Sequence, residues 1–125
     1  MTETQKEARK LANRKYWKTA KGKLMMTYNN MNRRVKGIQK KKAHLYEGLE
    51  LLSRDDFYSW SLKSLGFEVL YNDWVLSNYD RKLSPSIDRV DSSKGYNLSN
   101  MRWVTHSENS RLGSISKHND NDNNE

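Results

Sequence analysis

The stretch that decides the fold is SPSIDRVDSSKGYNLSNMRWVTHSENSRLG, residues 84–113. Residues 86–90 alternate polar and apolar side chains, which is the pattern of a short strand, and residues 101–105 have the composition of a second strand. The polar, glycine-containing segment between them is typical of a loop. Thr105 and Glu108 have the spacing of a capping box, so a helix is expected to begin near His106. The stretch therefore predicts strand, loop, strand and helix in that order.

Two oxygen-bearing side chains are placed to meet in this arrangement. Asp88 lies in the first expected strand, and Asn109 lies in the first or second turn of the expected helix. Carboxylate and amide oxygens suit a hard cation such as Mg²⁺, and two protein ligands leave room around it for water and phosphate. The alternative is that Asp88 is a turn residue and Asn109 a surface amide. We expect a small metal site.

The composition limits the size of the hydrophobic core. The chain has 125 residues, of which 34% are hydrophobic, and its mean hydropathy is -1.08. A single domain with a thin core is expected, and part of the chain is expected to order only on a partner. Because the chain has no cysteine, disulfides and thiolate zinc sites are excluded and no structural zinc is expected.

Neither a membrane segment nor a secretory signal is expected. No apolar run approaches the roughly 20 residues that span a bilayer. The first ten residues are polar and mixed in charge, unlike a signal peptide. We therefore expect a cytoplasmic protein with no membrane partner.

Positive charge is concentrated in the first part of the chain. Residues 1–50 carry 14 Lys or Arg against 4 Asp or Glu, a net charge of +10, whereas residues 51–125 carry 9 against 11, a net charge of -2. Such a basic region attracts phosphates through counterion release. It favours nucleic acid as the partner, over a membrane surface or a merely soluble basic protein.

Two helices are expected in the basic region. The first covers residues 3–19 and is expected to end because Gly22 follows it. The second covers residues 23–42, and its apolar residues fall on one stripe that is expected to pack against the domain rather than form a coiled coil: Leu24, Tyr28, Met31, Val35 and Ile38. The cations beside the stripe are expected to clamp a phosphate backbone, the alternative being a solvated face: Arg33, Arg34, Lys36, Lys40, Lys41 and Lys42.

A further helical region links the basic region to the hairpin. Ser53 is expected to cap a helix that ends at Gly66, and residues 68–78 predict another short helix or an irregular apolar segment. Their aromatic side chains are expected to lie in the core. The fold class is therefore α+β, with a mostly helical basic N-terminal region before a C-terminal hairpin and helix.

The run PSIDRVDSSKGYNLSNMRWVTHSEN resembles the ββα-metal motif of HNH endonucleases, and most of all the free-standing and intron-encoded HNH proteins common in bacteriophages. The resemblance covers about residues 45–113, is specific in the hairpin and helix, and is weaker upstream. It implies that Asp88 and Asn109 are metal ligands, for Mg²⁺ or Mn²⁺. It also implies that Asn100 is the residue that ties the loop to the strand.

The sequence departs from the family at position 89, where the family's usual residue is the histidine that activates water. Arg89 stays protonated and cannot act as an ordinary general base, but it can hold a phosphate bidentately. The base is therefore unassigned. His106 is the first candidate because it lies three residues before Asn109, His44 and metal-bound hydroxide are others, and His118 lies next to the tail.

The resemblance implies a metal-dependent endonuclease that nicks or cuts double-stranded DNA, is phage-encoded and homing-like, and works in the infected host cell. Residues 1–44 would be a basic helical DNA-binding extension, residues 45–117 the nuclease-like domain, and residues 118–125 a disordered tail. Lys94, Arg102 and Arg111 would contact phosphates, or would be ordinary exposed cations. The alternative function is an inactive module on the same fold that binds nucleic acid or a host or phage protein.

Overall fold

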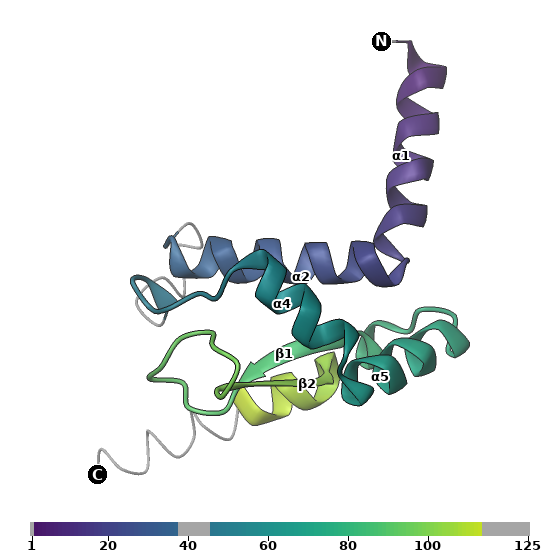
Figure 1. Ribbon diagram of the computed structural model, residues 1–125. Helices are drawn as coiled ribbons and strands as arrows, with labels where there is room; N and C mark the ends of the chain where they lie inside the picture. The colour runs from purple at the N-terminus through teal and green to yellow at the C-terminus, as the bar shows by residue number, and fades with distance from the viewer. Residues whose placement is uncertain (1, 38–45, 114–125) are drawn as a thin grey trace.

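The computed structural model describes residues 2–37 and 46–113 and has an α+β fold (Figure 1). Its helices are α1 (Glu3–Trp17), α2 (Ala20–Val35), α4 (Arg54–Leu62) and α5 (Leu65–Leu76), followed by a short 3₁₀ turn, η1 (Arg81–Leu83). Two antiparallel strands, β1 (Pro85–Arg89) and β2 (Met101–Thr105), form a hairpin. A helix over residues 106–113, here called the C-terminal helix, follows β2 directly. No helix of the described residues is long and apolar enough to cross a membrane.

The junction between α1 and α2 corrects the expected role of Gly22. The break falls at Lys18 and Thr19, and Thr19 caps α2 by accepting a hydrogen bond from the Gly22 N–H at 3.0 Å. Gly22 is buried inside α2, and a Cβ atom there would lie 1.9 Å from the carbonyl oxygen of Tyr16. The glycine therefore permits the close approach of two helices and does not separate them. Beyond this junction α1 projects away from the hairpin (Figure 1), and none of its residues is buried.

The second helix is shorter than its apolar stripe predicts. It ends at Val35, and Gly37 adopts a positive φ of 73°, which is the left-handed conformation that commonly follows a helix end. The expected residues 38–42, including Lys40, Lys41 and Lys42, lie outside the described residues.

Serine caps, rather than Gly66, set the boundaries of the two middle helices. Ser53 caps α4 through the Asp56 N–H at 3.1 Å, and Ser64 caps α5 through the Phe67 N–H at 3.2 Å. Gly66 therefore lies in the first turn of α5 and does not end α4, which stops at Leu62. A serine hydroxyl that accepts from a free helical amide outweighs the weak helix propensity of the glycine two residues later.

The first strand of the hairpin, β1, covers residues 85–89, one residue earlier at each end than the expected 86–90, whereas β2 has the expected bounds. Pro85 is the first residue of β1, a position where its missing N–H is tolerated. Val90 lies beyond the strand with an exposed side chain, although its N–H still donates to the carbonyl oxygen of Asn100 at 2.9 Å. The pairing joins Ile87 to Trp103 and Asp88 to Arg102.

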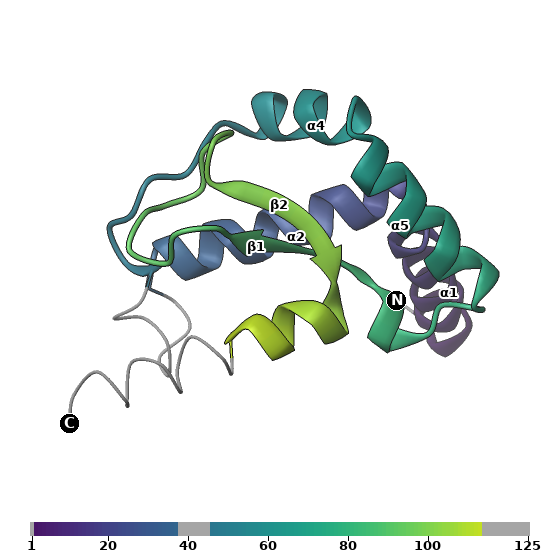
Figure 2. The ribbon, with the colours of Figure 1, turned by 90° about the horizontal axis from the view of Figure 1, so that it is seen from below.

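The core lies between α2, α4, α5 and one face of the hairpin (Figures 1 and 2). The expected packing stripe of α2 is confirmed, because Leu24, Tyr28 and Met31 are buried and Val35 packs against them. Its fifth member, Ile38, is outside the described residues. The other members of the core cluster come from α4, α5 and the hairpin region: Phe57, Phe67, Ile87, Tyr96 and Met101. The C-terminal helix covers the opposite face of the hairpin (Figure 2).

Candidate metal and phosphate site

The two faces of β1 have different surroundings. Pro85 and Ile87 are buried on the face that meets the core, so Ser86 and Asp88 lie on the other face, since strand residues alternate. The side-chain nitrogen of Asn109 donates to Ser86 Oγ at 2.7 Å and to the Ile87 carbonyl oxygen at 3.2 Å. The structure therefore brings Asp88 and Asn109 to the same face of the hairpin.

Backbone bonds and a cap hold the C-terminal helix on this face. The His106 N–H donates to the Ser84 carbonyl oxygen at 2.8 Å, which fixes the first turn beside the start of β1. Thr105 Oγ1 accepts from the Glu108 N–H at 3.1 Å and so caps the helix. The carboxylate of Glu108 pairs with Arg111 and not with the backbone of Thr105. The expected helix start is present, with one half of the capping box.

Asp88 is held by a neighbour on the paired strand. Its carboxylate is 14% exposed, and Oδ2 accepts from Arg102 Nε at 2.8 Å. Half of the Arg102 side chain is exposed, and an ion pair of this kind contributes about 1 kcal/mol or less to stability. Oδ1 of Asp88 makes no hydrogen bond to any described residue. One carboxylate oxygen thus remains available to a ligand.

The amide of Asn109 is oriented by its own hydrogen bonds. The side-chain nitrogen donates to Ser86 and to the backbone of Ile87, which uses both of its hydrogens. The oxygen Oδ1 accepts no hydrogen bond from any residue that the structure describes. Asp88 and Asn109 together offer two hard oxygen donors, and these fit Mg²⁺, Mn²⁺ or Ca²⁺ better than a soft metal. Among the described residues no three His, Cys, Asp or Glu side chains cluster, so such a cation would keep most of its shell as water or phosphate oxygens.

Arg89 does not share this face, so the structure does not bring the expected phosphate-holding side chain to Asp88 and Asn109. Its guanidinium carbon lies 4.2 Å from the centroid of the Tyr46 ring and 5.7 Å from that of Tyr96. Its Nη1 donates to the carbonyl oxygen of Lys94 at 3.0 Å. Alternation along β1 explains the result, because consecutive side chains point to opposite sides of a strand.

Asn100 fastens the loop between the strands. It is 5% exposed, and its oxygen accepts from the Asp91 N–H at 2.8 Å. Its nitrogen donates to the carbonyl oxygens of Asp91 and Gly95 at 3.0 Å and 2.8 Å. The loop is also joined to the upstream chain, because the Tyr96 N–H donates to the Glu50 carbonyl oxygen at 2.7 Å. These bonds fix where β1 ends, at Arg89, directly after Asp88.

His106 is exposed at the start of the C-terminal helix and lines a cleft between α2 and β1. Ser86, which accepts from Asn109, lines the same cleft, so His106 and the Asp88 face are neighbours. The other two histidines, His44 and His118, lie outside the described residues.

The expected phosphate-binding cations are dispersed. Arg33 and Lys36 are exposed on α2, and Lys94 is exposed in the hairpin loop. Arg111 is paired with Glu108, and this contact raises the pKa of the guanidinium and lowers the pKa of the carboxyl. Arg34 is half-buried and donates to the Tyr96 hydroxyl at 3.4 Å. Among the expected cations that the structure describes, only Arg102 lies beside the oxygen ligands.

Of the α2 residues that line the cleft, the sequence singled out only Arg34 as a phosphate contact. Lys23, Thr27, Asn30 and Arg34 line the cleft together with Ser84 and Ser86. Their spacing of four, three and four residues marks one helix face, as does the spacing of the apolar stripe on the neighbouring side. The signal was present in the periodicity, but only the structure sets this face against β1.

Comparisons with protein-family models, with curated proteins and with solved structures find no match to this chain.

Proposed function

We propose that this protein is a metal-dependent endonuclease of HNH type that hydrolyses phosphodiester bonds of double-stranded DNA. The observation that carries the proposal is the pair of free oxygens, Asp88 Oδ1 and Asn109 Oδ1, on the helix-covered face of a hairpin. In this proposal the hairpin and the C-terminal helix form a ββα-metal motif. The resemblance of residues 85–109 to that motif supports it.

Each residue of the proposed site has a separate role. Asp88 and Asn109 would hold Mg²⁺ or Mn²⁺, which would supply positive charge to the phosphate and to the leaving 3′ oxygen. Arg102 neutralises Asp88 in the free protein and becomes available to a phosphate oxygen once Asp88 binds a cation. Asn100 positions the loop. His106, the only histidine among the described residues, lines the adjoining cleft and accepts a proton from water, and the basic helices hold the duplex.

Cleavage of supercoiled plasmid with Mg²⁺, with Mn²⁺ and with EDTA tests the proposal. We expect nicked or linear product only with metal, and a loss of at least about 100-fold in Asp88→Ala and Asn109→Ala, since even the partners of metal ligands cost 10–100-fold when removed. Asp73→Ala and Asn72→Ala, two exposed positions on α5, are matched controls that keep the wild-type rate. Unchanged cutting in both site variants would overturn the proposal, provided that circular dichroism shows all four proteins folded.

The Asp88–Arg102 pair also favours a second candidate function. A carboxylate already neutralised by arginine, with Arg89 turned to the other face, suits a module that binds nucleic acid without cutting it. This candidate predicts salt-dependent DNA binding that EDTA leaves unchanged and no product with either metal. Calorimetric titration of Mn²⁺ into the protein separates the two: saturable binding that is lost in Asp88→Ala supports the nuclease, and no binding supports the module.

A further inference from the structure

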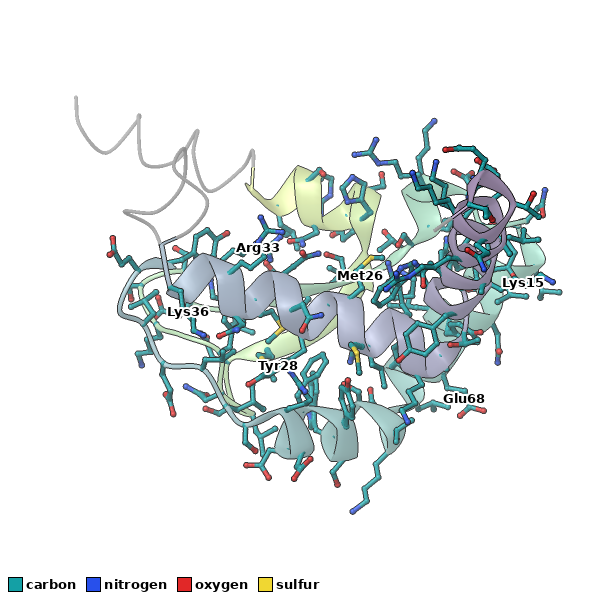
Figure 3. The ribbon with its side chains drawn as sticks, turned by 90° about the horizontal axis from the view of Figure 1, so that it is seen from above. Lys15, Met26, Tyr28, Arg33, Lys36 and Glu68 are labelled. Carbon is teal, nitrogen blue, oxygen red and sulfur yellow. The ribbon has the colours of Figure 1, made fainter. Side chains whose placement is uncertain are left out.

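A cleft of about 220 Å³ lies between α2 and β1, beside the proposed metal site. This volume is many times the roughly 15 Å³ that admits one water. The α2 side carries Lys23, Asn30 and Arg34, and the β1 side carries Ser84 and Ser86. Figure 3 shows that Met26, which also lines the cleft, points to one side of α2 and that Tyr28 points to the other. The polar residues of the cleft each precede a residue of the core stripe by one position, so they lie about 100° around the helix from it. The side of α2 next to the core stripe therefore forms a mostly polar, cationic wall.

Lys23 is a poorly hydrated cation in this wall. Its ammonium donates to Ser84 Oγ at 2.5 Å and lies 5.0 Å from the centroid of the Trp74 ring. Burial lowers the pKa of Lys23. No salt-bridge partner of Lys23 lies among residues 2–37 and 46–113. A cation that is partly removed from water and has no counter-charge is costly, and an anion in the cleft would lower that cost.

Arg34 extends the positive charge along the helix. It lies eleven residues after Lys23, so the two positions are about 16 Å apart along the axis of α2 at 1.5 Å per residue. Arg34 packs over the Tyr46 ring and donates to Tyr96, and it too has no carboxylate partner in the described part of the chain. A strand of duplex DNA carries one phosphate about every 3.4 Å along the axis. The wall is therefore long enough for several successive phosphates and longer than a single free phosphate needs.

The cleft adjoins the proposed metal site through one side chain. Ser86 lines the cleft, and its hydroxyl accepts from the amide of Asn109 at 2.7 Å. Asn30, His106 and the serine hydroxyls add further hydrogen-bond donors to the two cations. Proteins contact the phosphates of a nucleic-acid backbone with this combination of cations, hydroxyls and amides.

We infer that the cleft between α2 and β1 is a phosphate-binding groove that holds the sugar–phosphate backbone of a nucleic-acid strand next to the proposed metal site, with Lys23 as its main contact. The identity of the ligand as nucleic acid rests on the proposed function. The groove itself rests on the cleft, its cations and their lack of counter-charges.

The test is the salt dependence of binding to a labelled DNA duplex in EDTA, where no cleavage occurs. For Lys23→Met we expect the slope of log affinity against log salt to fall by about 0.9, the value for one lost phosphate contact. Lys21→Met is the matched control, because Lys21 is exposed on the same helix and lies outside the cleft. Equal slopes for Lys23→Met and Lys21→Met would overturn the inference.

A second pair of variants guards against a folding defect. Asn30→Asp keeps the size of a cleft side chain and adds a negative charge, whereas Asn29→Asp adds the same charge at an exposed position beside it. We expect Asn30→Asp to weaken DNA binding several-fold more than Asn29→Asp. Equal weakening would mean that only the net charge of α2 matters, and this result would also overturn the inference.

Two further outcomes separate this inference from the proposed function. Binding that depends on Lys23 without any metal-dependent cleavage would leave the groove in place and reject the nuclease. Metal-dependent cleavage, together with a salt-dependence slope that Lys23→Met leaves unchanged, would support the nuclease and reject the groove. Inorganic phosphate followed by ¹⁵N NMR tests the ligand: saturable shifts at residues 23 and 30, with no change in the DNA slope, would assign the cleft to a free phosphate and overturn the backbone assignment.

Discussion

The two faces of the hairpin differ in what touches them. On one face Ile87, Met101 and Trp103 meet α4 and α5, and the Trp103 ring lies 4.7 Å from that of Phe67. On the other face Asp88 and Arg102 pair with each other under the C-terminal helix. One face is held by apolar contact, and the other by a few polar bonds.

This difference indicates where stability and chemistry reside. Ile87 and Met101 on the core face are buried, so truncating such a side chain leaves a cavity and lowers the free energy of unfolding. The polar face contains an ion pair that contributes little to stability and two oxygens without a partner among the described residues. A substitution on the first face should therefore change the fold, and one on the second should change binding.

The sharpest test uses two neighbouring residues of β2. Met101 is 6% exposed on the core face, and Arg102 is half-exposed on the polar face. We expect Met101→Ala to lower the free energy of unfolding by about 2–5 kcal/mol and Arg102→Ala by about 1 kcal/mol or less. Urea unfolding followed by tryptophan fluorescence measures both. Similar losses in the two variants would contradict the division between the faces.

A smaller loss is expected at the end of the hairpin, where the faces join. Asn100→Ala removes three hydrogen bonds and leaves part-buried backbone groups of Asp91 and the buried carbonyl of Gly95 without partners, which costs about 1–3 kcal/mol. Amide exchange at Asp91 should accelerate, because its N–H loses its acceptor. Asn72→Ala, on the exposed side of α5, is the control and should leave both measurements unchanged. Unaltered exchange at Asp91 would show that the loop is held by other contacts.

The elements that short-range patterns define were predicted best. The alternation of residues 86–90 and the Thr105 cap predicted the hairpin and the start of the C-terminal helix within a residue. The stripe of α2 predicted its buried face, because the 3.6-residue period is a property of the local sequence. Glycine was interpreted less well. Gly22 and Gly66 were expected to end helices. Gly22 instead lies within α2, where it allows close contact with the Tyr16 carbonyl, and Gly66 lies in the first turn of α5, which Ser64 caps.

The candidate site was predicted only in part, because the positions of Arg89 and of the cleft residues depend on tertiary contacts. Asp88 and Asn109 meet on one face through a hairpin and a helix that are local in sequence. The position of Arg89 depends on Tyr46, which lies more than forty residues upstream. Lys23 lies 61 residues from Ser84, its hydrogen-bond partner. No local pattern relates such distant positions, so the cleft could be recognised only from the fold.

The smallest expected effect is the dependence of stability on the protonation of Asp91, in the loop that joins the two strands. Asp91 accepts from the Ser93 hydroxyl at 2.6 Å and from the Ser93 N–H at 2.9 Å, and these bonds, with weaker help from Lys94 and Arg89, lower the pKa of its carboxyl. A lowered pKa in the folded state means that the unfolded chain binds more protons as the solution is acidified. The contribution of the Asp91 carboxylate to folding stability is therefore complete above the unfolded pKa of about 4. It is lost as the pH falls through the lower pKa of the folded state.

Carbon-13 NMR of the Asp91 carboxyl between pH 6 and 2 measures this effect. We expect its midpoint below the ordinary value of 3.8, with the protection of the Ser93 amide against exchange, relative to the intrinsic rate at each pH, falling as the carboxylate loses its charge. Ser93→Ala removes the stronger of the two bonds and should move the midpoint back towards 3.8, whereas Ser92→Ala, at the exposed neighbouring position, should leave it in place. If Asp91 titrates at its ordinary value in the wild type, the loop is not fastened by this carboxylate. The loop between the strands would then be held by the neutral hydrogen bonds of Asn100, and protonation of Asp91 would not lower the stability of the hairpin.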